Sequence, residues 1–142
     1  MAFALKGTGT LFSGDHVMGW STTIVAPPDG AMSDYMASLR RLATRPESTY
    51  LAGHGDVIRN APDYVAHLVR HRLGREDAIL SRLATGDAEI ASLVRSIYVG
   101  LDPRLSGAAA LSVLAHLEDL VARGLVATDG APSLAGRYRL AR

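Results

Sequence analysis

The stretch Leu11-Phe12-Ser13-Gly14-Asp15-His16 decides the fold, together with Gly53-His54-Gly55 further along the chain. In each stretch a run that reads as a strand stops at a glycine, and a carboxylate or an imidazole follows. Glycine lets the backbone turn sharply and approach a bound ion closely. Carboxylate oxygen and neutral imidazole nitrogen are ligands that divalent metals accept. Two such strand ends that face one point would form part of a metal site.

The residues around these motifs predict short strands and one helix. Strands are expected at residues 2–5 and 10–12, joined by the turn Lys6-Gly7-Thr8-Gly9, which lacks the following helix of a phosphate-binding loop. A strand-like run is expected at residues 22–26. A helix with Ser33 as its N-cap is expected over residues 33–44, and a strand over residues 49–52 leads to His54.

From Asn60 onward the pattern is helical. A helix is expected to run from Asn60 to about residue 83, with a kink or a break at Gly74. Further helices are expected at residues 87–98 and 105–123, the second with apolar residues at three-and-four spacing and Gly124 as its C-cap. Residues 125–128 and 137–140 then predict a two-stranded wing, which completes a winged-helix pattern.

At its two motifs the chain resembles the metallo-β-lactamase-fold hydrolases. Phe12-Ser13-Gly14-Asp15-His16 is similar to the family's Gly-Asp-His motif, and Pro27-Pro28-Asp29-Gly30, a helix and Gly53-His54-Gly55 follow in the family's order. The resemblance is closest to the β-lactamase-like protein 2 type, which has a winged-helix-like C-terminal extension. It covers nearly the whole chain but only the C-terminal part of the family, because the His-x-His-x-Asp-His motif and a further histidine are absent.

The resemblance implies an α+β fold in two parts. Residues 1–59 would form the C-terminal strands and helix of an αββα metallo-β-lactamase sandwich, and residues 60–142 a helical winged-helix-like domain. It also implies that Asp15 is the catalytic carboxylate that bridges two metal ions, usually zinc, and that His54 is the last imidazole ligand.

Each site residue also has a plainer interpretation. By itself Asp15 could be a turn aspartate, and His54 a structural histidine between glycines. His16 could support the ligands from behind or be an ordinary polar loop residue. Trp20 could form a wall of the substrate pocket or serve as a buried anchor. His67 and His71 lie one helical turn apart, but no glutamate accompanies them as in His-Glu-x-x-His, and we assign no metal there.

The function that the resemblance implies is metal-dependent hydrolysis of an ester, thioester or amide, with RNA as an alternative substrate. A bound divalent ion lowers the pKa of water to near neutrality and polarises the electrophile. The chain supplies only Asp15 and His54, whereas catalytic zinc sites use three protein ligands. We therefore expect a truncated gene product or proteolytic remnant, with weak or absent zinc binding and no activity by itself.

Composition excludes several other classes of protein. The 142 residues are 48% hydrophobic and 20% charged with a net charge of +1, which is typical of a globular chain. Cysteine is absent, so disulfides and thiolate metal sites are excluded and a cytoplasmic location is expected. We find no run long enough for a membrane span and no signal peptide, so no membrane partner is expected.

The helical half leaves an alternative function open, namely a winged-helix module that binds nucleic acid or protein. Residues 60–142 contain ten arginines, no lysine and nine acidic residues, so duplex DNA is not expected as a partner. The basic wing residues Arg137, Arg139 and Arg142 keep the alternative in view. A third hypothesis is a structural dimerisation unit. Because uncovered sheet faces and edges seek partners, a homo-oligomer through residues 1–55 is expected.

Overall fold

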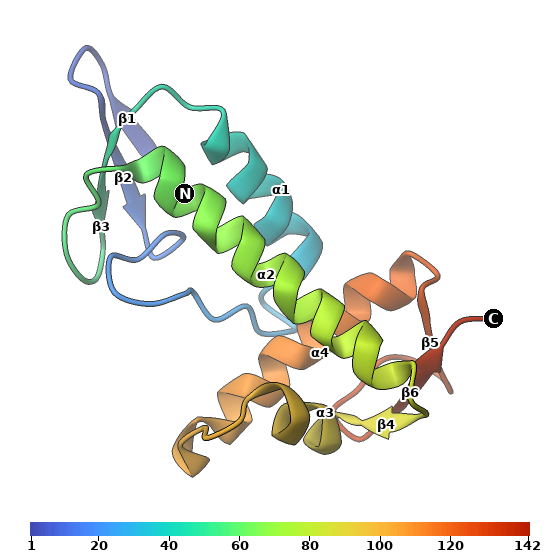
Figure 1. The fold of residues 1–142 in the computed structure, drawn as a ribbon. Coiled ribbons are helices and arrows are strands. Elements are labelled where there is room, and N and C mark those ends of the chain that lie inside the picture. The colour runs from blue at the N-terminus through green and yellow to red at the C-terminus, as the bar shows by residue number, and fades with distance from the viewer. The chain divides into compact units, whose positions relative to one another are not determined.

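Four α-helices and two three-stranded sheets make up residues 1–142 of the computed structural model (Figure 1). The α+β class expected from the sequence is confirmed. Backbone contacts group the chain into one unit of residues 1–23 and 36–71 and a second unit of residues 24–35 and 72–142. The boundary between residues 35 and 36 falls within the helix α1 (Met32–Ala43), and the boundary between residues 71 and 72 falls within the helix α2 (Ala61–Leu83). The division between residues 59 and 60 stays a prediction.

The first unit contains a small mixed sheet, in which β2 (Thr10–Gly14) lies between β1 (Phe3–Leu5) and β3 (Thr49–Ala52). β1 pairs with β2 antiparallel, and β2 pairs with β3 in parallel. The predicted glycine-rich turn joins β1 to β2, where the Thr8 hydroxyl donates to the Leu5 carbonyl at 2.9 Å. All three strands were expected from the sequence, but β1 begins at Phe3 and β2 runs on to Gly14.

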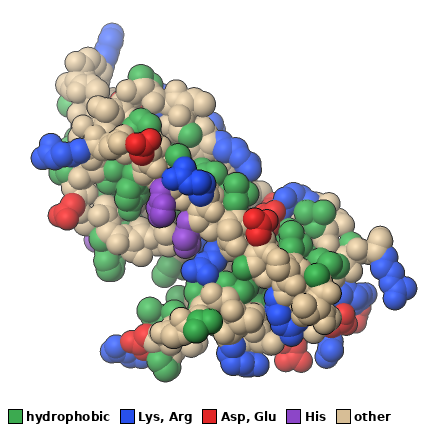
Figure 2. Space-filling model, viewed as in Figure 1, with side chains coloured by type: hydrophobic (Ala, Val, Ile, Leu, Met, Phe, Trp, Pro, Cys, Tyr) green, Lys and Arg blue, Asp and Glu red, His purple; other side chains and the backbone are tan.

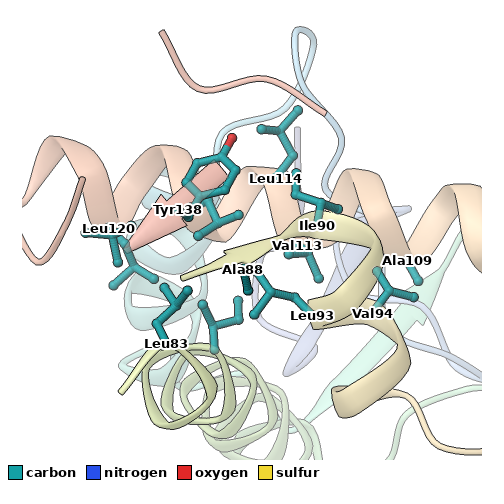
Figure 3. Packing of buried hydrophobic residues seen from close by; sticks show 13 residues of the cluster. Leu83, Ala88, Ile90, Leu93, Val94, Ala109, Val113, Leu114, Leu120 and Tyr138 are labelled. Carbon is teal, nitrogen blue, oxygen red and sulfur yellow. The ribbon is translucent and has the colours of Figure 1, made fainter. Parts of the chain in front are cut away.

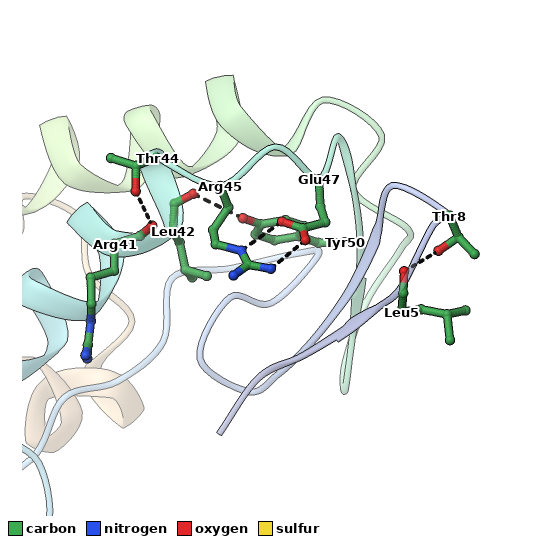
Figure 4. A network of polar contacts seen from close by, with 8 residues as sticks. All are labelled: Leu5, Thr8, Arg41, Leu42, Thr44, Arg45, Glu47 and Tyr50. Atoms are coloured by element: carbon green, nitrogen blue, oxygen red, sulfur yellow. Dashed lines mark hydrogen bonds and ion pairs between the residues drawn. The ribbon is translucent and has the colours of Figure 1, made fainter.

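One face of this sheet is buried and the other is open. Leu11 and Tyr50, which are register partners on β2 and β3, are 3% and 1% exposed, whereas Phe12 is 45% exposed. Successive residues of a strand point to opposite faces, which explains the alternation. Figure 4 shows how the loop before β3 is held: the Tyr50 hydroxyl donates to the Leu42 carbonyl at 3.3 Å, and Arg45 Nε donates to Glu47 Oε2 at 2.9 Å.

Two expectations for residues 22–44 were wrong. No strand forms at residues 22–26, because their backbone pairs with neither sheet, and the Thr23 hydroxyl bonds instead to the turn at Asp15. Ser33 is not an N-cap, because α1 already begins at Met32 and the first helical hydrogen bond runs from the Tyr35 amide to the Ala31 carbonyl. The apolar residues at helical spacing on α1 are all buried: Tyr35, Met36, Leu39 and Leu42.

The helix α2 begins where the sequence predicted. The Asn60 side-chain amide donates to Asp63 Oδ2 at 2.7 Å, and Pro62 occupies the first turn, where its missing N–H costs nothing. The helix is continuous to Leu83, so the expected alternative of a break at Gly74 is wrong. A β-carbon at Gly74 would meet no atom within 4 Å. Gly74 is thus an exposed position within a continuous helix.

The second unit has the winged-helix pattern of three helices and a small sheet. Its winged-helix part runs from the end of α2 through α3 (Ile90–Ile97), the short helix η1 (Pro103–Leu105) and α4 (Ser106–Ala122) to the strands β5 (Val126–Thr128) and β6 (Arg137–Leu140). The sequence predicted a helix over residues 87–98, but α3 begins only at Ile90. Ala88 and Glu89 instead form β4, which pairs with β6 and adds a third strand to the wing.

A single hydrophobic cluster stabilises this unit, and Figure 3 shows side chains from its helices and from β6 converging. The stripe predicted on α4 is confirmed, since Val113, Leu114, Leu117 and Leu120 are all buried in it. Tyr138 of β6 is fully buried. Its hydroxyl donates to the Ser133 carbonyl at 2.7 Å and accepts from the Ser133 amide at 2.8 Å, which ties the wing loop to the core.

The residues 103–122 form one stretch that is long and apolar enough, by length and composition alone, to cross a membrane. The expectation that no run reaches this length was wrong, because the alanine-rich start of α4 continues into its core stripe. Eight residues of α4 are buried within the chain. The core helix of a globular unit has the same composition, and packing in the cluster accounts for it.

Candidate metal centre

The two motifs meet in the first unit. Asp15 follows β2, and His54 lies in the turn after β3, so the parallel pairing brings both ends to the same edge of the sheet. The Gly53 amide donates to the Gly14 carbonyl at 3.0 Å and continues this pairing past the strands. Asp15 Oδ1 and His54 Nδ1 are 2.6 Å apart. A carboxylate oxygen and an imidazole nitrogen therefore converge on one point.

Glycines create the space that this contact needs. A β-carbon at Gly53 would lie 2.7 Å from Asp15 Oδ1, so any other residue would push the carboxylate away. On the far side of His54, Gly55 pairs with Gly19, and the Gly19 amide donates to the His54 carbonyl at 2.9 Å. A β-carbon at Gly19 would come within 2.0 Å of the Asp56 carbonyl oxygen. The turn that carries His54 thus rests directly on the backbone of the Asp15 loop.

Hydroxyl groups fix the turn that carries Asp15. The buried Ser13 hydroxyl donates to the Val17 carbonyl at 2.8 Å and closes the turn from inside. The Thr23 hydroxyl lies 2.6 Å from the Asp15 carbonyl oxygen and 3.1 Å from the His16 carbonyl oxygen. The Thr23 hydroxyl thus holds the backbone carbonyl of Asp15, while the side chain of Asp15 contacts Gly53 and His54.

The pair is open to solvent and chemically suited to a divalent ion. The side chains of Asp15 and His54 are 65% and 66% exposed. One oxygen and one nitrogen donor fit a borderline metal such as zinc, and the opening leaves room for further ligands. No third His, Asp or Glu joins them within this chain. The residues fit a metal as two members of a larger ligand set.

His16 and Trp20 occupy different surroundings on the same loop. The imidazole of His16 is partly buried, and its pKa is lowered by desolvation, with smaller contributions from the N-terminal amino group and from Arg41. Trp20 is 73% exposed, so the interpretation of a buried anchor is wrong. A role in supporting the ligands for His16, and in lining a pocket for Trp20, stays a prediction.

Sequence reasoning missed the residues that hold the site together. It passed over the hydroxyl of Thr23 because that residue read as part of a strand. It associated Gly53 with a sharp turn and close approach to an ion, and not with the side chain of Asp15, which the missing side chain of Gly53 accommodates. The repeated glycines at residues 53 and 55 on either side of His54 were the available signal, because each marks a close approach.

Comparison with known proteins supports the expected resemblance. Residues 90–136 match the family described as the β-lactamase-associated winged helix domain. The chain is 36% identical over 84 residues to the thioesterase pkgB of Emericella nidulans and 29% identical over 119 residues to the β-lactamase-like protein 2 homolog of Drosophila melanogaster. These alignments cover 59% and 82% of the chain.

The structure also matches a solved one. A metallo-β-lactamase family protein from Thermus thermophilus superimposes with a TM-score of 0.79 and 29% identity over 98% of the chain. The chain spans less than half of each of these proteins: 24% of pkgB, 39% of the Drosophila protein and 44% of the Thermus protein. The resemblance read from the Gly-Asp-His and Gly-His-Gly motifs is confirmed.

Proposed function

We propose that this chain, which corresponds to a C-terminal part of a metallo-β-lactamase-fold protein, contributes Asp15 and His54 to the zinc centre of a hydrolase. The observation that carries the proposal is the 2.6 Å contact between Asp15 Oδ1 and His54 Nδ1 at the edge of the parallel strand pair. Both donors are exposed, and both backbones are held by hydrogen bonds and glycine contacts. Such pre-organisation lowers the cost of binding an ion.

The chemistry that zinc supplies when bound is a water of near-neutral pKa together with polarisation of the electrophile. Within this chain, Asp15 offers a carboxylate of fixed position, and His54 offers an imidazole nitrogen. The thioesterase pkgB is among the relatives, and we propose a thioester as the substrate class. Two protein ligands are fewer than the three of catalytic zinc sites, so we expect weak zinc binding and no thioester hydrolysis by the chain alone.

The contact between Asp15 and His54 permits two arrangements. In the arrangement that we propose, both side chains bind the ion. In the other, Asp15 accepts a hydrogen bond from His54 Nδ1–H and orients the ring, and only Nε2 of His54 binds. The substitution Asp15→Asn distinguishes the two arrangements, because an amide oxygen still accepts the hydrogen bond but is a weaker metal ligand than a carboxylate.

The test is zinc titration by calorimetry of the wild-type chain and of Asp15→Asn, Asp15→Ala and His54→Ala. We expect all three substitutions to remove measurable binding. Wild-type affinity in Asp15→Asn with loss in Asp15→Ala would favour the orienting role. Unchanged affinity in His54→Ala would overturn the proposed centre. Circular dichroism of each variant checks that the fold is retained.

The helical unit is proposed to serve packing and not duplex DNA binding. Four of the nine arginines in residues 72–142 form ion pairs: Arg104 with Asp102 at 2.7 Å, Arg123 with Glu76 at 2.7 Å, Arg137 with Asp87 at 3.5 Å, and Arg139 with Asp129 at 3.0 Å. On the face shown in Figure 2, Lys and Arg side chains are scattered among acidic and apolar ones. These ion pairs reduce the positive charge available for phosphate contacts, which dominate nucleic-acid affinity.

A further inference from the structure

A shallow, open cleft of about 430 Å³ lies beside the turn that carries His54. The residues that line it come from the Asp15 loop, from the segment after His54 and from the start of α2: Gly19, Val57, Ile58, Arg59, Asn60, Asp63 and Tyr64. All of them belong to the first unit of the chain. The cleft is thus built by the same loops that position the two candidate metal ligands.

The wall of the cleft is an extended segment held against the sheet. Ile58 pairs antiparallel with Tyr50, and the two residues exchange backbone hydrogen bonds of 2.8 and 3.0 Å. Ile58 is buried, while its neighbours Val57 and Arg59 are exposed, as alternation along an extended segment requires. The Tyr64 hydroxyl donates to the Met18 carbonyl at 2.8 Å and fastens α2 to the opposite loop.

The two charged side chains of the cleft differ in their partners. The carboxylate of Asp63 accepts a hydrogen bond from the Asn60 side-chain amide and lies in the first turn of α2, where the helix dipole favours negative charge. Arg59 is exposed and makes no ion pair. Val57, which is 45% exposed, provides an aliphatic surface two residues away. The cleft therefore offers one uncommitted cation next to an apolar wall.

The cleft is coupled to the candidate metal centre through Gly19. Gly19 lines the cleft and donates its amide to the His54 carbonyl at 2.9 Å. Its neighbour Trp20 packs over Gly55, where a β-carbon would lie 2.8 Å from Trp20 Cδ1. The Gly19 loop therefore contacts both the cleft and the turn that carries His54.

We propose that this cleft binds an anionic oxygen group, a carboxylate or a phosphate, on the non-reacting part of a thioester substrate. Arg59 is the cationic partner, and Val57 is the apolar contact. A guanidinium suits both groups, because its planar donors match two oxygens at once. The inference rests on the proposed hydrolase function and names the part of the substrate that this chain recognises.

The test uses three probes and no metal. Octanoyl-coenzyme A carries phosphates on its carrier, the mono-N-acetylcysteamine thioester of octanedioic acid carries a carboxylate on its acyl chain, and the N-acetylcysteamine thioester of octanoic acid has no charge. Each is titrated by calorimetry into the chain in the presence of a chelator. Emission from Trp20, the single tryptophan, gives a second readout close to the cleft.

We expect at least one charged probe to bind about five-fold more tightly than the uncharged one, since an exposed charge pair contributes modestly. Arg59→Gln should remove this preference, and higher salt should reduce it. Arg40→Gln, which changes an exposed arginine of α1 without an ion pair, should keep it. The charged probe that binds identifies the source of the anion.

Equal binding of all three probes, or a preference that survives in Arg59→Gln, would overturn the proposed subsite. Because a chelator is present, these outcomes do not depend on zinc. A failed zinc titration together with an Arg59-dependent preference would therefore reject the metal centre and support the anion subsite. Normal zinc binding without an Arg59-dependent preference would support the metal centre and reject the anion subsite.

Discussion

Gly53 leaves the space that the carboxylate of Asp15 occupies, since a β-carbon at position 53 would lie 2.7 Å from Asp15 Oδ1. The backbone at Gly53 has no left-handed conformation, so an alanine would strain the site through this contact alone. Gly53 and Asp15 are far apart in the sequence. A substitution at Gly53 can therefore move the carboxylate of Asp15 while leaving Asp15 itself in place.

We expect Gly53→Ala to weaken zinc binding, because the new methyl group displaces Asp15 from His54. Calorimetric titration with zinc measures the loss. The control is Gly74→Ala, in open space on α2, which should leave zinc affinity unchanged and stabilise the chain by about 0.5–1 kcal/mol. Wild-type zinc affinity in Gly53→Ala would contradict the assigned position of Asp15.

Tyr138→Phe should lower the free energy of unfolding by about 1–2 kcal/mol, because both hydrogen bonds between its hydroxyl and Ser133 are lost. Urea unfolding followed by circular dichroism measures the change. Tyr98→Phe is the matched control, since the Tyr98 ring lies under Arg75 and its hydroxyl makes no hydrogen bond. Equal effects of the two substitutions would show that the wing loop is held by other contacts.

The ion pair of Arg45 and Glu47 gives stability a pH dependence. The hydrogen bond from the Arg45 side chain lowers the pKa of Glu47. A carboxylate with a lowered pKa stabilises the folded state above its unfolded pKa, and this contribution disappears as the pH falls through the folded pKa. We expect Glu47→Gln to be less stable than wild type at pH 7 and to lose less stability on acidification.

Urea midpoints measured from pH 7 to pH 3 test this expectation. Glu89→Gln is the control, because Glu89 is an exposed glutamate without an ion pair. A profile of Glu47→Gln parallel to that of wild type would mean that the contact with Arg45 contributes nothing to stability.

The open face of the first sheet is proposed to drive self-association through residues 1–55. Phe3, Leu5 and Phe12 project from one face of paired strands and are 61%, 52% and 45% exposed, and β1 is an edge strand. We propose a second copy of the chain as the partner. Phe12→Thr should weaken association in sedimentation at micromolar concentration, while Val99→Thr, in an exposed loop, should not. A strictly monomeric wild-type chain would reject the proposal.

The sequence specified those parts of the fold that local patterns encode. Periodic apolar residues predicted α4 and its stripe, and glycines after apolar runs predicted the two strand ends that meet at Asp15 and His54. The two-residue strand β4 was not predictable, because two residues have no period and their pairing depends on the distant Tyr138. The exposure of Trp20 was not predictable either, since it depends on how the loop packs over Gly55.

The site itself was predictable as a pair of residue types, but its support was not. The hydroxyl bonds of Thr23 and the fit of Gly53 against Asp15 are long-range contacts that appear only once the strands are paired. Threonine carries no local signature of such a contact, because it occurs for many reasons in loops. The glycines on either side of His54 indicate a close approach but do not identify its partner.

The most direct test of a shared ion is a double-mutant cycle of zinc affinity with Asp15→Ala, His54→Ala and the combined variant. If the two side chains hold one ion, each single substitution removes binding and the combined variant binds no more weakly than either. A single variant with wild-type affinity, or one that keeps part of the affinity that the combined variant loses, would contradict a centre made by Asp15 and His54.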